Sequence, residues 1–318
     1  MGFNMKKKIL ISGLGGSLFP YLNEKISTIY DIFYVDSDPL LAKLYPNYNF
    51  YHAPNVTSDE YENFIKNIIL SNNIQYYLPL IDEELLFSKN KIGGFNGVIV
   101  IAPSENFITL SLDKYRLMIE LSKLNISTIN SYKGNNFKWD GTSIFVKPIT
   151  GRGSRGIRKI NSKLELDAYY LLENYEPENI LIQELIEGTE YTVGATVNDL
   201  NQVLSISIKK IIKKKGITQV AVMTENDKIY NVIIEVIENL KPCGPINVQL
   251  FLTKDDEVKI FEINPRFSTT TIMSYEGGVD EISLFINQLG ISQINSIIQP
   301  KSGIVLHRRW ESVFYNEE

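Results

Sequence analysis

The chain has 318 residues, of which 44% are hydrophobic and 22% charged, and its formal net charge is -5. This balance excludes wholesale disorder and a generally basic, nucleic-acid-binding surface, and the length allows one to three domains or subdomains. The single cysteine, Cys243, excludes an internal disulfide and a cysteine-rich zinc site, so a reducing, cytoplasmic location fits. No stretch approaches the roughly 20 apolar residues that span a bilayer, and we expect no membrane partner.

The first third of the chain alternates strand and helix patterns, which is typical of a parallel α/β sheet. Apolar runs predict strands over 7–13, 30–36, 76–81 and 97–103. Helices are expected between them, from about Ser17 and over 58–73.

The pattern changes beyond about residue 110. Ser111 or Asp113 is expected to cap a helix whose apolar positions Leu117, Leu121 and Leu124 recur at helical spacing. A strand, a glycine loop and a second strand follow over 143–160. The remaining patterns are a helix over 162–175, strands over 179–186, 191–197, 203–212 and 218–223, a helix over 228–240, and strands over 245–253 and 257–264. Strands predominate after residue 190, so this part is predicted to be α+β.

The stretch "FEINPR" ends the last strand with polar residues at alternate positions. Because side chains of a strand alternate between its two faces, Glu262, Asn264 and Arg266 are predicted to point one way, and Phe261 and Ile263 the other. One face of this strand is therefore expected to be core and the other to carry chemistry.

A hairpin joins this strand to the one before it. A two-residue turn at 255–256 makes paired residue numbers sum to a constant, which places Gln249 opposite Glu262 and Asn247 opposite Asn264. Carboxylate and amide oxygens suit Mg²⁺, whose remaining positions phosphate and water fill, and a neighbouring arginine can grip phosphate. The alternative is a solvated outer face, because the proline of the motif favours a strand end or edge.

The stretch "VKPITGRGSRGI" places Lys147 at the end of an apolar strand, just before a loop with glycines at 151, 153 and 156. Backbone N–H groups of such a loop can converge on phosphate oxygens. A strand follows the loop, which excludes a P-loop and favours a glycine flap over a nucleotide. An ordinary mobile hairpin is the alternative for the loop alone.

In their order along the chain, Lys114, Lys147, the glycine loop, "QELIEGTE" and the 247–266 hairpin resemble the ATP-grasp superfamily, specifically short single-unit proteins similar to one half of the carbamoyl-phosphate synthase large chain. The motifs "KPxxGxGSRGI" and "EINPR" carry the resemblance, which covers nearly the whole chain. It implies an α/β N-terminal Rossmann-like (pre-ATP-grasp) domain over 1–110, followed by an α+β ATP-grasp fold of two subdomains. These are a small lid subdomain over 111–190 and a C-terminal subdomain with the metal site over 191–318.

The resemblance also implies roles for individual residues. Those expected at ATP are Lys114 and Lys147 on the phosphates, Gly151, Gly153, Ser154 and Gly156 in the lid loop, Glu184 and Ile186 at adenine through their backbone, and Glu190 on the ribose. The expected Mg²⁺ ligands are Gln249, Glu262 and Asn264, and Arg266 is expected to stabilise the transferred phosphate with Lys147.

The activity implied is that of an ATP-dependent carboxylate–amine ligase. A substrate carboxylate takes the γ-phosphate of ATP to give an acyl phosphate, an amine captures it as an amide, and ADP and phosphate leave. The partners expected are therefore small carboxylate and amine substrates, with no nucleic acid, and a homodimer is expected by similarity. The alternatives are a bicarbonate-activating enzyme, similar to carbamoyl-phosphate synthase or biotin carboxylase, and a degenerate ATP-binding subunit.

Three other features of the sequence have alternative interpretations. "ISGLGGS" with Asp36 and Asp38 resembles part of a dinucleotide-binding motif, but its glycine pattern is incomplete. In the basic run 209–216, Lys209 or Lys210 is a candidate for attracting substrate, against a solvated hairpin end. Structural or surface roles are expected for the two histidines at 52 and 307, whereas the arginines at 308 and 309 are candidates for the mouth of the substrate site.

Overall fold

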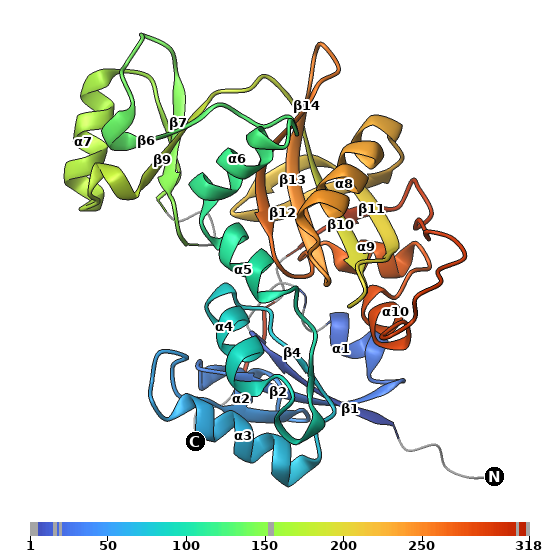
Figure 1. Ribbon diagram of the computed structural model, residues 1–318. Coiled ribbons are helices and arrows are strands. Elements are labelled where there is room, and N and C mark those ends of the chain that lie inside the picture. Colours follow the sequence, from blue (N-terminus) through green and yellow to red (C-terminus); the bar gives the residue numbers. More distant parts are fainter. Residues whose placement is uncertain (1–5, 15–17, 19–20, 152–155, 310–311, 316–318) are drawn as a thin grey trace.

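The computed structural model describes residues 6–14, 18, 21–151, 156–309 and 312–315. Within these ranges the chain forms a five-stranded, a four-stranded and a six-stranded sheet (Figure 1). None of the helices in this part of the chain is long and apolar enough to cross a membrane.

The N-terminal unit is a parallel sheet in the order β3-β2-β1-β4-β5 with helices around it. The strands β1, β2 and β4 are short apolar runs that are mostly buried, as parallel strands generally are, whereas the edge strands β3 and β5 are partly exposed. Its elements are β1 (Lys7–Ser12), α1 (Tyr21–Ile26), β2 (Tyr30–Asp36), α2 (Leu40–Leu44), β3 (Asn49–His52), α3 (Tyr61–Asn72), β4 (Tyr76–Leu78), α4 (Asp82–Phe87) and β5 (Ile99–Val100). The predicted strands and the helix over 58–73 are thus confirmed in type, whereas Ser17 lies outside the described residues.

Two consecutive helices, α5 (Glu105–Leu112) and α6 (Lys114–Lys123), leave the N-terminal unit. Asp113 separates them and caps α6, because its side chain accepts a hydrogen bond from the Arg116 N–H at 2.9 Å. The expected cap at Asp113 is therefore confirmed. Leu117 and Leu121 point into the core of the six-stranded sheet.

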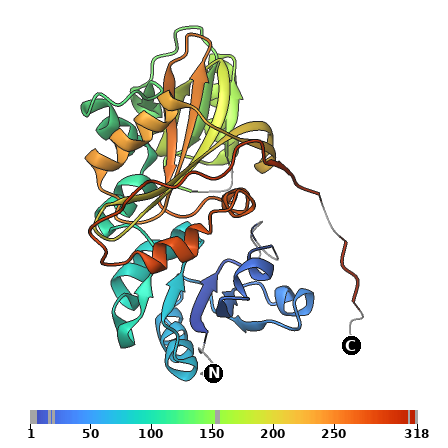
Figure 2. The ribbon, with the colours of Figure 1, turned by 90° about the vertical axis from the view of Figure 1, so that its right-hand side faces the viewer.

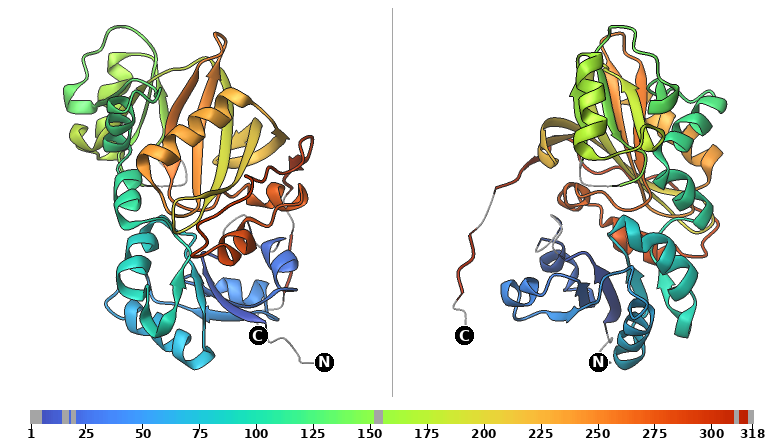
Figure 3. Two further views of the ribbon diagram at one scale, coloured as in Figure 1. Left: turned by 45° about the vertical axis from the view of Figure 1, so that its right-hand side comes forward. Right: turned by 90° about the vertical axis from the view of Figure 1, so that its left-hand side faces the viewer.

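The small sheet is antiparallel, in the order β6-β9-β7-β8, and carries one long helix (Figure 3). Its elements are β6 (Ser131–Lys133), β7 (Ile144–Pro148), β8 (Arg158–Ile160), α7 (Lys163–Glu173) and β9 (Ile180–Glu184). Its core is separate and small, with Val146, Tyr169 and Ile182 among its members.

The six-stranded sheet is antiparallel, in the order β14-β13-β10-β11-β12-β15. Its strands are β10 (Gly188–Val197), β11 (Val203–Lys215), β12 (Ile217–Thr224), β13 (Ile246–Thr253), β14 (Val258–Asn264) and β15 (Val305–His307). One face packs Val193, Val248 and Ile263 against α5, α6 and the amphipathic helix α8 (Asp227–Leu240). The opposite face carries the polar side chains described below.

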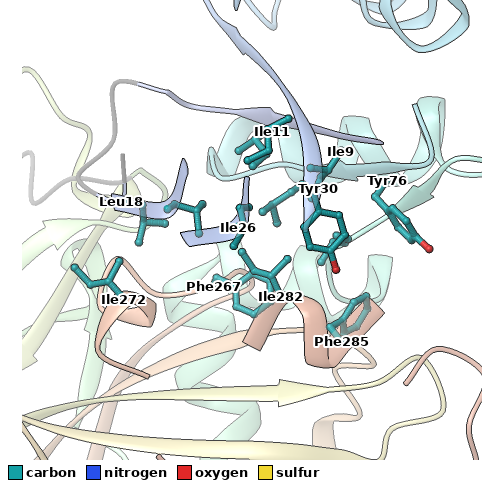
Figure 4. Packing of buried hydrophobic residues seen from close by; sticks show 14 of the residues in the cluster. Ile9, Ile11, Leu18, Ile26, Tyr30, Tyr76, Phe267, Ile272, Ile282 and Phe285 are labelled. Atoms are coloured by element: carbon teal, nitrogen blue, oxygen red, sulfur yellow. The ribbon is translucent and has the colours of Figure 1, made fainter. Parts of the chain in front are cut away.

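Two short helices, α9 (Thr271–Glu276) and α10 (Glu281–Asn287), lie between the N-terminal unit and the six-stranded sheet (Figure 2). Side chains from both parts make one core there, and Figure 4 shows Ile9 and Tyr30 facing Ile282 and Phe285. Each large apolar side chain buried in this way stabilises the fold by about 1.5–3 kcal/mol. The N-terminal unit is thus packed directly onto the segment that follows the "EINPR" motif.

Candidate active site

A cavity of about 640 Å³ lies between the four-stranded and the six-stranded sheets and is bordered by the N-terminal unit. The small sheet contributes Phe145, Lys147 and Gln183, the six-stranded sheet contributes its polar face, and α4 contributes Glu83. Of the residues predicted to contact the nucleotide, the metal or the transferred phosphate, those that the structure describes all line this cavity, with the exception of Gly156. Gly153 and Ser154 lie outside the described residues.

The hairpin β13–β14 forms one wall of the cavity. Gln249 pairs with Glu262, and Asn247 pairs with Asn264, so these four side chains share one face. Asn247 is further held by Thr192, whose hydroxyl donates to the Asn247 Oδ1 at 2.7 Å. The predicted pairing of the candidate metal ligands is present in the structure.

The turn and the alternation of this hairpin differ from the prediction. The Thr253 N–H donates to the Glu257 carbonyl, so the turn has three residues instead of two. A register shift then leaves Phe261 without a partner on β13, and its ring turns to the cavity instead of the core. The bulge restores the register beyond it, which is why the pairing of Glu262 was predicted correctly although the turn was not.

Lys147, at the end of β7, reaches across the cavity to this wall. Its Nζ lies 3.6 Å from the Glu262 Oε2 and donates to the Phe261 carbonyl at 3.2 Å. Burial lowers the pKa of Lys147 to about 8, although Glu262 acts in the opposite direction. The ammonium is therefore held in an environment that is ready to receive more negative charge.

Glu262 is surrounded by cations. Burial alone raises the pKa of its carboxyl, but Lys147, Lys114 and Lys214, with Arg266, lower the pKa below its ordinary value. The carboxylate is therefore ionised at neutral pH.

Lys114 lies beside Gly151, one of the two described glycines of the glycine loop. The Lys114 Nζ donates to the Gly151 carbonyl at 2.7 Å. Gly151 and Gly156 have φ of 120° and 69°, which residues with a side chain rarely adopt. The backbone on both sides of the loop thus requires glycine.

The stretch "QELIEGTE" runs along another wall of the cavity. The Glu184 carboxylate accepts hydrogen bonds from the Asn130 N–H and Nδ2, both at 3.0 Å, and Ile186 lines the cavity directly. Glu190 accepts a hydrogen bond from the Lys214 Nζ at 2.5 Å. The three candidate nucleotide contacts, Glu184, Ile186 and Glu190, therefore line the cavity along one continuous segment of the chain.

Arg266 leaves the end of β14 towards the N-terminal unit. Its Nε donates to the Asp82 Oδ1 at 2.6 Å, and its Nη1 donates to the Phe267 carbonyl at 3.3 Å. Asp82 was not predicted, since it lies 184 residues away in the sequence.

The two candidate lysines of the basic run, Lys209 and Lys210, do not line the cavity. Lys209 is fully buried beside Ser207 and α10, and its pKa is lowered by burial, while Lys210 is exposed. Lys214 lines the cavity instead and also donates to the Gln249 Oε1 at 3.0 Å. Two register irregularities in β11 separate these lysines, so simple alternation does not indicate which of them faces the site.

The remaining candidates lie behind the site or away from it. Arg308 donates from Nε to the Thr218 carbonyl and from Nη2 to the Thr269 carbonyl, at 3.0 and 2.6 Å, so it supports the rim. Arg309 is exposed, and His52 lies near the Ser37 carbonyl. Gly13 adopts φ 76°, and a Cβ there would lie 2.9 Å from Ile81, so packing explains this glycine.

A cavity lined by cations and by carboxylate and amide oxygens, between a small sheet with a glycine loop and a larger antiparallel sheet, is suited to the phosphates of a nucleotide. The family model for the ATP-grasp domain matches residues 111–270. The chain belongs to the ATP-grasp family.

Relatives and solved structures agree with this assignment. Tyramine–L-glutamate ligase of Methanocaldococcus jannaschii is 25% identical over 251 residues, which are 74% of this chain and 73% of the relative. The L-amino acid ligase of Bacillus licheniformis has a TM-score of 0.70 at 15% identity, covering 90% of this chain and 74% of the other. Carboxyaminoimidazole ribonucleotide synthase of Aspergillus clavatus, solved with ATP, has a TM-score of 0.74 at 16% identity, covering 94% and 81%. The predicted activity class, an ATP-dependent carbon–nitrogen ligase, is confirmed.

Proposed function

We propose that the cavity binds ATP with Mg²⁺ and activates a small carboxylate as an acyl phosphate for capture by an amine. The observation that carries the proposal is that Lys147, Lys214 and Arg266 converge on one 640 Å³ cavity with the oxygen donors of β13–β14. Cations arranged in this way stabilise the charge that spreads over a transferring phosphoryl group.

The oxygen donors suit Mg²⁺. Across the described residues no group of three or more His, Cys, Asp or Glu side chains could hold a metal. The cavity face of the hairpin offers one carboxylate, Glu262, with the amide oxygens of Gln249 and Asn264. Magnesium typically takes one or two protein carboxylates and completes its shell with phosphate oxygens and water. These three residues would hold the ion, which would neutralise the negative charge that develops during phosphoryl transfer.

The nucleotide is proposed to lie between the two antiparallel sheets. Lys114 and Lys147 would contact its phosphates beneath the loop that contains Gly151, Gly153, Ser154 and Gly156. The adenine would meet the backbone at Glu184 and Ile186, and the ribose would meet Glu190. Phe261 and Lys214 add an apolar ring and a cation that the sequence did not predict.

The proposed reaction has two steps. A substrate carboxylate oxygen attacks the γ-phosphorus of ATP and ADP leaves, and the amine then attacks the acyl carbon and displaces phosphate. The carboxylate is ionised at neutral pH, so the first step needs no base. One relative is named as a ligase of tyramine and L-glutamate, and one solved structure is named as an L-amino acid ligase. These names support an amino acid as the carboxylate substrate.

The finer architecture is proposed in the same way. Residues 1–110 are proposed as a Rossmann-like pre-ATP-grasp domain, which the parallel strand order supports. Residues 111–190 and 191–318 are proposed as the lid and C-terminal subdomains. The cytoplasmic location, the homodimer and the bicarbonate alternative stay predictions.

Thermal unfolding tests the proposed site. ATP with Mg²⁺ at about 100 times its dissociation constant should add about 2.7 kcal/mol, a rise in Tm of a few degrees. ATP with EDTA should give a smaller rise, and Glu262→Ala should remove the effect of magnesium. Glu257→Ala, an exposed carboxylate on the same hairpin, serves as the matched control. A magnesium-dependent shift that survives in Glu262→Ala would reject the metal assignment.

A further inference from the structure

Arg266 is held by a residue of a different part of the fold. Its backbone N–H donates to the Asn264 carbonyl at 2.9 Å, which fixes where the side chain leaves β14. The side chain then pairs with Asp82, and the two side chains are only 18% and 12% exposed. An ion pair so sheltered is screened little by solvent, unlike a surface pair.

The geometry of the pair fixes the plane of the guanidinium. Its five N–H donors form a rigid fork, and the contacts with Asp82 and the Phe267 carbonyl engage Nε and Nη1. Arg266 also lines the cavity. Its guanidinium is therefore oriented by Asp82 of the N-terminal unit and is accessible from the cavity.

Asp82 is itself on a firmly held element. It is the first residue of α4, and two positions later Glu84 is buried, accepting a hydrogen bond from the Tyr61 hydroxyl at 2.5 Å and another from Tyr77 at 3.3 Å. These contacts tie the first turn of α4 to α3 and β4. The carboxylate of Asp82 is therefore placed by the packing of the N-terminal unit.

We propose that Asp82 is a positioning residue that orients Arg266 for phosphoryl transfer, so that the N-terminal unit completes the catalytic platform of the six-stranded sheet. This inference rests on the proposed function. In this inference Asp82 does not contact the substrate and acts only by orienting Arg266.

The test compares affinity for a transferring phosphoryl group with affinity for product. Dissociation constants of MgADP are measured with and without aluminium fluoride, which mimics the transferring phosphoryl group, alongside basal ATP hydrolysis. The variants are Asp82→Asn, Arg266→Lys, their combination, and Asp31→Asn, an exposed aspartate of β2 as matched control.

We expect aluminium fluoride to tighten MgADP binding to the wild type and to Asp31→Asn. Asp82→Asn should lose about tenfold or more of this gain, with binding of MgADP alone within about twofold. In the Arg266→Lys background, Asp82→Asn should cause no further loss, because a residue that acts through another gives non-additive effects. Asp82→Glu, which keeps the charge but moves it by one methylene, serves the same test if Asp82→Asn does not fold.

Two results would overturn the inference: a full gain in Asp82→Asn, or losses that add independently in the double variant. If the wild type binds MgADP but shows no gain with aluminium fluoride, the phosphoryl-transfer site itself is rejected, and the role of Asp82 with it.

Discussion

Lys214 joins two residues with different proposed roles. Its Nζ donates to Glu190, proposed at the ribose, and to Gln249, proposed at the metal, and it lies 5.7 Å from the centre of the Phe261 ring. Lys214 would therefore lie between the ribose and the metal of the proposed nucleotide complex.

We expect Lys214→Met to weaken MgATP binding about tenfold, because a charge-assisted hydrogen bond contributes about 1.5–3 kcal/mol. Calorimetric titration measures this, and the loss should be smaller for adenosine, which has no phosphates. Lys213→Met is the control, since Lys213 is exposed and adjacent in the strand. Equal effects of the two substitutions would mean that only net charge matters.

The residues of the site that belong to local motifs can be predicted from the sequence. Lys147, Glu262 and Asn264 stand at fixed positions within strands, so their faces follow from alternation. Lys214 and Asp82 were missed for physical reasons: irregular pairing in β11 hides the face of Lys214, and the contact of Asp82 with the site depends on tertiary packing that no local pattern records.

Among the elements, α4 is anchored by an unusual buried carboxyl. Glu84 is 4% exposed, and burial raises the pKa of its carboxyl above 4.5, although Ser12, Tyr61 and Tyr77 act in the opposite direction. The folded state therefore binds the proton more tightly than the unfolded state does. The stability that this group contributes is complete below pH 4.5 and is lost as the pH rises through the folded-state pKa.

Glu84→Gln should consequently gain stability relative to the wild type as the pH rises above 4.5, by about 1.4 kcal/mol for each unit of the raised pKa. The amide still offers an acceptor to the Tyr61 hydroxyl and has no proton to lose. Thermal unfolding from pH 4.5 to 8 gives the difference, with the exposed Glu60→Gln as control. A difference in stability that does not change with pH would show that folding leaves the pKa of Glu84 unchanged.

The β13–β14 hairpin shows how far element prediction reaches. Strand type, length and the Gln249–Glu262 pairing were predicted, whereas the turn length and the bulge at Phe261 were not. Apolar alternation determines a strand, but a bulge exchanges one face for the other without any required residue type. The longer turn and the bulge shift the register in opposite directions. The residues at the end of β14 therefore have the partners that a two-residue turn without a bulge predicts.

On the scale of the whole molecule, the N-terminal unit and the six-stranded sheet share a core through α9 and α10, whereas the small sheet has its own. Phe285, 2% exposed in that shared core, should cost about 3–5 kcal/mol when replaced by alanine. Hydrogen exchange should then show lost protection in β1 and β4 as well as α10, with the small sheet unchanged.

The exposed Leu172→Ala in α7 is the control, since this side chain is 85% exposed. Lost protection confined to α10 would contradict the shared core and would mean that the N-terminal unit is stable by itself.

The position of α9 and α10 also bears on the construction of chimeras. The ATP-grasp match ends at residue 270, just before α9, yet the residues that follow pack against the N-terminal sheet. A recombinant enzyme that takes its N-terminal unit from a relative would therefore place a foreign surface on Ile272, Ile282 and Phe285 if the exchange stopped at the family boundary. The unit to transplant is discontinuous, and it includes the residues from Phe267 to Leu289 together with the amino-terminal part.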